Sequence, residues 1–82
     1  MCVSIPGQIT DIIASAHRIA LVDIAGQLRT IDLGLLSADQ GAVGDWVLVH
    51  AGLAISRVDA TDAHIILAML QAYDQLDQEK RL

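Results

Sequence analysis

The chain has 82 residues, a formal net charge of −5 and a hydrophobic fraction of 54%. This length leaves room for a single domain spanning residues 1–82, and one cysteine excludes an internal disulfide. The acidic balance and the scarcity of aromatic residues argue against a nucleic-acid-binding surface, because phosphates would be repelled and bases would find few rings to stack on.

The beginning of the chain has no basic region followed by an apolar stretch, so the sequence predicts no secretory signal. The longest apolar run is too short to cross a bilayer. Together with the unpaired thiol, these features predict a protein of the reducing cytoplasm that does not bind a membrane.

Residues 1–58 are predicted to form an N-terminal tag and a β-barrel. Their apolar residues come in short runs of branched aliphatics separated by glycines, which is typical of strands joined by turns. The predicted strands are residues 8–14, 18–24, 28–33, 46–50 and 53–58, with a loop over 35–43. Five short strands with mostly short connections favour a mainly β fold, a small OB-like antiparallel β-barrel, because closure removes exposed strand edges.

Residues 59–80 are predicted to form a C-terminal helix, since this segment contains neither glycine nor proline and Asp59 suits the N-cap position. Apolar residues at helical spacing define one face, formed by Ala63, Ile66, Leu67, Leu70, Tyr73 and Leu76. The first turns of this face are expected to pack on the barrel. The last turns could instead bind another protein.

Cys2 directly follows Met1, which is normally removed before a small residue. An N-terminal cysteine carries a thiol and an α-amine that can both face one metal ion, and thiolates bind iron and copper. The alternative is that Cys2 is merely a small apolar residue. Chemistry alone gives these two interpretations similar weight.

Pro6 and Gly7 are predicted to determine where the N-terminal tag leaves the barrel. Proline restricts Ile5 to extended backbone, and glycine then permits a sharp change of direction. An ordinary beginning of a strand would explain the same two residues, so their interest depends on Cys2.

His50 ends an apolar run, and alternation along a strand places it on the same face as Trp46 and Leu48. Such a histidine is most often structural, but it could also be a second ligand or proton partner for Cys2. Trp46 is expected in the core or at the centre of an interface. Asp45 is expected to brace the turn before it.

The sequence has no phosphate-binding glycine loop, paired-carboxylate site or serine triad, so an independent enzyme is not expected. A thiol catalyst built on Cys2 and His50 stays open as an alternative, although no third residue that would orient them is evident. His17 and His64 are interpreted as a turn residue and an exposed helix residue without a function.

Two motifs stand in a fixed order along the chain: MCVSIPGQ at residues 1–8 and GDWVLVHAGLAIS at residues 44–56. They resemble the two signatures of the HypC/HybG/HupF family, the small chaperones of nickel–iron ([NiFe]) hydrogenase maturation. Length, intervening strands and the acidic C-terminal helix agree, so the resemblance spans the whole chain. The departures are minor: Gln8 replaces the commoner lysine, and Ser4 a commoner alanine or glycine.

The resemblance implies a metallochaperone or assembly factor and not an enzyme. Family members form a complex with an iron–sulfur scaffold protein (HypD-like), on which an iron centre acquires cyanide and carbon monoxide ligands. They then associate with the hydrogenase large-subunit precursor and help to deliver this transient Fe(CN)2CO cargo. The family fold is a small OB-type barrel with a C-terminal helix.

The resemblance also assigns candidate site residues. The family's functional N-terminal cysteine corresponds to Cys2, which is the expected metal-binding residue, and the histidine of the second motif corresponds to His50, the candidate second ligand. The residues expected to bind partners are Cys2, Pro6, Gly7, Trp46 and His50.

Overall fold

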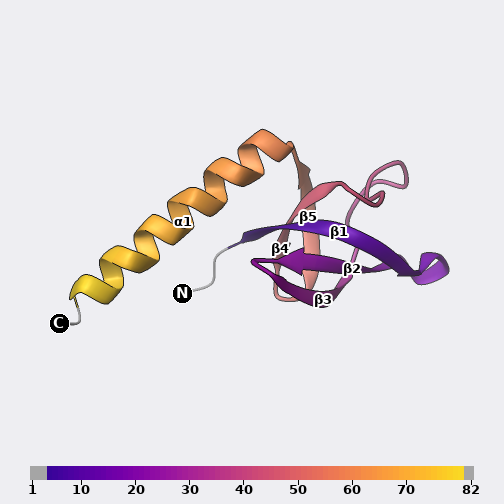
Figure 1. Cartoon of the computed structure of the whole chain (residues 1–82). Helices are drawn as coiled ribbons and strands as arrows, with labels where there is room; N and C mark the ends of the chain where they lie inside the picture. Colours follow the sequence, from indigo (N-terminus) through magenta and orange to yellow (C-terminus); the bar gives the residue numbers. More distant parts are fainter. Residues whose placement is uncertain (1–3, 81–82) are drawn as a thin grey trace.

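A computed structural model describes residues 4–80, apart from the side chains of Ser15 and residues 73–80. These residues form a β-barrel followed by one long helix (Figure 1). In chain order the elements are β1 Ile5–Ala14, the 3-10 turn η1 Ser15–His17, β2 Ile19–Ile24, β3 Gln27–Asp32, β4 Trp46–His50, β5 Leu53–Val58 and α1 Ala60–Lys80. The predicted mainly β fold with a C-terminal helix is confirmed.

The five strands close into a barrel in the order β1-β2-β3-β5-β4. Strand β1 pairs antiparallel with both β2 and β4, which closes the cylinder. The prediction of an antiparallel barrel holds for every pair except β3 and β5, which meet in parallel at Asp32 and Leu53. After β3 the chain crosses over, and β4 lies beside β1 and antiparallel to it. Strand β5 is antiparallel to β4 and therefore runs in the same direction as β1 and β3, so it meets β3 in parallel.

The core lies inside the barrel and consists of aliphatic side chains from alternate strand positions. Along β4, Val47 and Val49 are buried while their neighbours are only half-buried, as period-2 alternation requires. Leu33 and Leu36, which follow β3 in the loop before β4, also belong to this core. The buried cluster comprises Ile9, Ala20, Val22, Ile31, Leu33, Leu36, Val47, Val49 and Ala54.

Two hairpins of the barrel use the same kind of turn. Ala25 and Gly26 have φ angles of 52° and 88°, and Ala51 and Gly52 have 52° and 82°. Two successive positive φ values define the type I′ turn, whose twist matches that of the flanking strands. Glycine at the second position adopts this conformation without strain, which explains the Ala-Gly pair at both turns.

Strand β1 begins earlier than expected, at Ile5, so Pro6 and Gly7 lie inside the strand. They pair with Leu48 and Val47 of β4, and Gly7 does not have a positive φ. The prediction that Gly7 changes the chain's direction is therefore wrong. Proline is tolerated because the first residues of β1 have only one neighbouring strand, as at a sheet edge.

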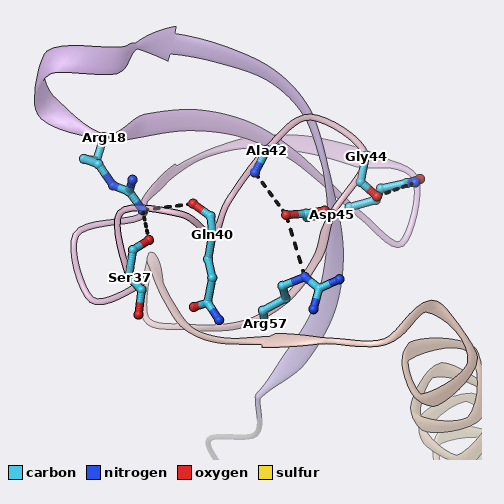
Figure 2. Close-up of polar contacts among 8 residues, drawn as sticks. Arg18, Ser37, Gln40, Ala42, Gly44, Asp45 and Arg57 are labelled. Carbon is cyan, nitrogen blue, oxygen red and sulfur yellow. Dashed lines mark hydrogen bonds and ion pairs between the residues drawn. The ribbon is translucent and has the colours of Figure 1, made fainter.

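Arg18 was expected to begin a strand but instead adopts a left-handed conformation, with a φ of 56°, one residue before β2. Its guanidinium donates hydrogen bonds to the carbonyl oxygens of Leu33, Ser37, Ala38 and Gln40, at 3.1–3.4 Å. Figure 2 shows this side chain reaching Ser37 and Gln40. One arginine thus fastens the loop that follows β3.

We expect Arg18→Ala to destabilise the protein by about 1–3 kcal/mol, because four carbonyl groups lose a charged donor. At ~4–8 °C per kcal/mol for a domain of this size, the midpoint of thermal unfolding should fall measurably. Circular dichroism would follow it. Arg18→Lys keeps the charge but not the planar fork of donors, and should recover only part of the loss. An unchanged midpoint in Arg18→Ala would contradict this role.

Helix α1 leaves the barrel after β5 and projects away from it (Figure 1). The Ala63 amide donates to the Asp59 carbonyl at 2.9 Å, which makes Asp59 the N-cap residue. Ala63 is completely buried, and Ile66 and Leu67 are half-buried, which confirms that the first turns pack on the barrel.

Further along α1 the apolar face is less covered. Leu70 is half-buried, while the side chains of Tyr73 and Leu76 lie outside the described residues. On the neighbouring surface of the helix, Ile65 and Met69 are 53% and 66% exposed. Neither α1 nor any other helix within residues 4–80 combines the length and apolarity needed to cross a membrane.

Candidate functional site

The end of the barrel at which β1 begins is where the two sequence motifs meet. Ile5 of the first motif lies opposite Val49 of the second, and the pairing continues to Gln8 opposite Trp46. The β2–β3 and β4–β5 turns lie at the same end, because β2 and β4 both run antiparallel to β1. We call this end, formed by Ile5 and the turns 25–26 and 51–52, the N-terminal rim (Figure 1).

His50 is the last residue of β4 and stands at the N-terminal rim beside the β4–β5 turn. It is half-buried on the outer face of β4, together with Trp46 and Leu48, as the alternation predicted. Within residues 4–80 no hydrogen bond joins its imidazole ring to another residue. The backbone contacts expected of a purely structural histidine are thus missing from the described part of the chain.

Cys2, the predicted functional residue, lies outside the described residues. The described chain reaches the barrel at Ile5, which pairs with the residue preceding His50. The first motif therefore enters the barrel next to the histidine of the second motif. A contact between Cys2 and His50 stays a prediction.

Pro6 and Gly7 are both buried within β1. An added Cβ on Gly7 would lie 2.5 Å from Cγ1 of Val22 and 2.9 Å from Cγ1 of Ile24. At position 7, side chains of β2 thus approach the backbone of β1 so closely that no residue larger than glycine fits. These two residues shape the strand that carries the N-terminus and leave little surface for direct contact.

Trp46 lies at the junction between the barrel and helix α1. Its half-buried ring meets the ring of His64 edge to face, with centroids 5.1 Å apart and planes at 69°. Edge-to-face geometry is favourable for aromatic pairs. The structure thus places Trp46 outside the barrel core and against helix α1, while its expected role in binding a partner protein stays a prediction. Sequence reasoning missed His64 as its neighbour because no local pattern joins the two positions.

Asp45 braces the turn that precedes β4, as predicted (Figure 2). Its Oδ2 accepts a hydrogen bond from the Ala42 amide at 3.1 Å, and its own amide donates to the Ala42 carbonyl at 3.0 Å. Arg57 of β5 adds an ion pair at 3.8 Å, a separation at which a partly exposed pair contributes little. The Asp45 carbonyl also accepts from the amide of Ile9 at 2.9 Å, which ties the second motif to β1.

Metal-binding side chains are scattered over the described surface. Within residues 4–80 no three or more His, Cys, Asp or Glu side chains come together in a group that could hold a metal ion. Of the two predicted ligands, only His50 belongs to this part of the chain.

Fold and site together define a small OB-like barrel protein in which an N-terminal motif and a histidine-bearing motif pair at one rim. The sequence model of the HupF/HypC family matches residues 1–70, and the chain belongs to this family.

Individual relatives agree with the family match. The chain is 40% identical over 75 residues to hydrogenase maturation factor HypC of Escherichia coli K12, covering 87% of this chain and 80% of the relative. It is 34% identical over 76 residues to hydrogenase maturation factor HybG of the same organism, covering 90% and 93%. The uncharacterized protein C of the Frd operon of Proteus vulgaris is 33% identical over 81 residues. The resemblance inferred from the two motifs is confirmed.

Proposed function

We propose that this protein is a hydrogenase maturation chaperone that carries an iron centre with cyanide and carbon monoxide ligands and helps to deliver it to the hydrogenase large-subunit precursor. One observation carries the proposal: the two family motifs pair residue by residue, from Ile5 opposite Val49 to Gln8 opposite Trp46. Relatives covering most of the chain are named hydrogenase maturation factors. The protein acts as an assembly factor and not as an enzyme.

The cargo is held by the thiolate of Cys2, with His50 as the second candidate ligand. Because a strand extends by about 3.3 Å per residue, the Cα of Cys2 can lie at most ~11 Å from that of Ile5. Ile5 pairs with the residue next to His50, so the thiol can reach the histidine side of the rim. Thiolate and imidazole are both suitable iron ligands.

Two protein ligands would leave most positions on the iron to its own cyanide and carbon monoxide ligands and to the receiving protein. A carrier needs such an open arrangement, because it must release what it holds. We therefore expect modest affinity for free iron and tighter binding when the cargo is shared with a partner. The partners are the HypD-like iron–sulfur scaffold protein and the large-subunit precursor, both met in the cytoplasm.

The test is affinity purification of the tagged chain from its native cytoplasm, with the tag at the C-terminus so that the N-terminal motif stays unaltered. Partner identification should return the scaffold protein and the large-subunit precursor. Infrared spectroscopy of the same sample should show cyanide and carbonyl stretches. A preparation with neither partner and without these bands would contradict the proposal.

A further inference from the structure

Along the edge of β3 that faces away from β2, backbone amide and carbonyl groups are available to hydrogen-bond another strand. The Asp32 amide donates to the Gly52 carbonyl at 3.0 Å and therefore faces β5. The next amide, of Leu33, donates to the Arg18 carbonyl at 2.7 Å and faces the β2 side. Along an antiparallel ladder, successive residues direct their amide and carbonyl groups to opposite sides of the strand. The β2–β3 ladder has no register shift, so this alternation is unbroken along β3. The amides and carbonyls of Leu28 and Thr30 thus face away from β2.

Strand β5 does not cover these groups. It pairs with β3 only at Asp32 and Leu53, at the end of β3, and the preceding residues of β3 pair with β2 alone. Within residues 4–80, the outward amides and carbonyls of Leu28 and Thr30 therefore have no protein partner. They form two donors and two acceptors at the spacing of alternate strand residues, which is the pattern that an added strand would match.

The side chains of β3 leave room for such a strand. Gln27 to Thr30 are all exposed, on both faces of the hairpin, and Leu28 is 61% exposed. Folded proteins usually protect a free edge with proline, a bulge or several charges. This edge has neither proline nor bulge, and Arg29 is its one charged residue among Gln27 to Thr30.

We propose that the β3 edge, defined by the backbone of Leu28 and Thr30, binds an extended segment of the large-subunit precursor by strand addition. This inference rests on the proposed function. A precursor that still lacks its metal centre can offer a segment that is not yet folded, and only an extended main chain supplies donors and acceptors at this spacing.

Charge indicates which segment fits. The exposed guanidinium of Arg29 has one hydrogen bond among the described residues, to Oε1 of Gln27 at 2.9 Å, and favours an acidic residue opposite it. A second copy of this chain fits less well. Pairing Leu28 with Thr30 of another copy would place Arg29 opposite Arg29, and two chains of charge −5 repel each other.

The position of the edge connects it with the cargo site. The β4–β5 turn that begins after His50 makes the contact between Gly52 and Asp32. Thr30 and Leu28 precede Asp32 in β3 and lie roughly 7 and 13 Å from it toward the β2–β3 turn, at about 3.3 Å per residue. A precursor strand bound there would run past the N-terminal rim, where the iron centre has to be transferred.

Hydrogen exchange tests the proposal directly. The 15N-labelled full chain is mixed with the large-subunit precursor encoded in the same genome, exchanged in D2O, quenched and analysed by NMR. The amides of Leu28 and Thr30 should exchange at least about tenfold more slowly in the complex, since each gains a hydrogen bond. The amide of Arg29, already bonded within the β2–β3 ladder, should change little. A complex that leaves Leu28 and Thr30 unprotected overturns the proposal.

A pair of variants provides the second measurement. Thr30→Pro removes the outward amide and spares the β2 ladder, whereas Thr30→Val keeps the amide and changes only the side chain. The first should bind the precursor at least tenfold more weakly, and the second like the parent. Equal binding by a folded Thr30→Pro would overturn the proposal. If that variant does not fold, the exchange experiment decides alone.

The outcomes separate this inference from the function on which it rests. A parent chain that forms no complex with the precursor and carries no cyanide or carbonyl bands contradicts the proposed function. A parent chain that binds the precursor without protecting Leu28 and Thr30 contradicts only the strand addition. Protection by the scaffold protein and not by the precursor contradicts the choice of occupant.

Discussion

Cys2→Ala should reduce hydrogenase maturation to background while the barrel stays folded. Within residues 4–80, the hydrophobic cluster inside the barrel is formed by side chains between Ile9 and Ala54, and we expect this cluster to keep the variant folded. The thiolate, in contrast, is the proposed iron ligand, and a methyl group cannot replace it. The measurements are hydrogenase activity in cells that carry the variant as their sole copy, and the thermal unfolding midpoint of the purified chain.

Matched variants separate the thiol from other causes. Cys2→Ala and Cys2→Ser both keep a small residue after Met1, so removal of the methionine should be unaffected. Serine preserves size and polarity but is a poor iron ligand, and should fail like alanine. His50→Ala should fold and retain part of the activity if the thiolate carries most of the binding. Full maturation in a folded Cys2→Ala chain would contradict the proposed carrier.

Gly7→Ala is expected to destabilise the barrel by overpacking the contact between β1 and β2. The added Cβ would lie 2.5 Å from Cγ1 of Val22, 2.9 Å from Cγ1 of Ile24 and 3.2 Å from the Asp23 carbonyl oxygen. All three neighbours belong to β2, and Val22 is completely buried. Overpacking of this kind costs about 2–3 kcal/mol, which lowers the unfolding midpoint by roughly 10–20 °C.

Gly34→Ala is the control for the loss of a glycine as such. Its added Cβ would meet only the Asp32 side chain, at 3.0 and 3.9 Å. That carboxylate accepts a hydrogen bond from the Gly34 amide at 2.7 Å, and a shift of a few tenths of an ångström relieves the contact while keeping this bond. A cycle with Val22→Ala tests the cause, because the cost of Gly7→Ala should shrink once the clashing methyl groups are removed. If Gly7→Ala unfolds at the same temperature as the parent, β1 and β2 are not as closely packed as the structure indicates.

Strong local periodicity made most of the fold predictable. The boundaries of 46–50 and 53–58 agree with β4 and β5, and the helix begins one residue after Asp59. Pro6 and Gly7 misled the prediction of β1, because they end strands in most contexts. Here that segment of β1 pairs with β4 alone, a condition set by barrel closure and invisible in the local sequence.

Features that depend on distant contacts could not be predicted. Arg18 looked like a strand residue, and its role depends on carbonyl groups 15 to 22 residues further along the chain. The two motifs were recognisable one by one, but their direct pairing is a property of the closed barrel. Likewise, the free edge of β3 follows from the pairing of β3 with β5 at one position alone, which no pattern within β3 indicates.

The contact between Trp46 and His64 has a practical consequence. Trp46 is the only tryptophan of the chain, and its ring lies where helix α1 joins the barrel. Its emission therefore comes from a single, structurally defined place, with an imidazole as immediate neighbour. The protein thus has an intrinsic fluorophore where α1 packs against the barrel, and detachment of the helix during unfolding or complex formation can be followed in solution without a label.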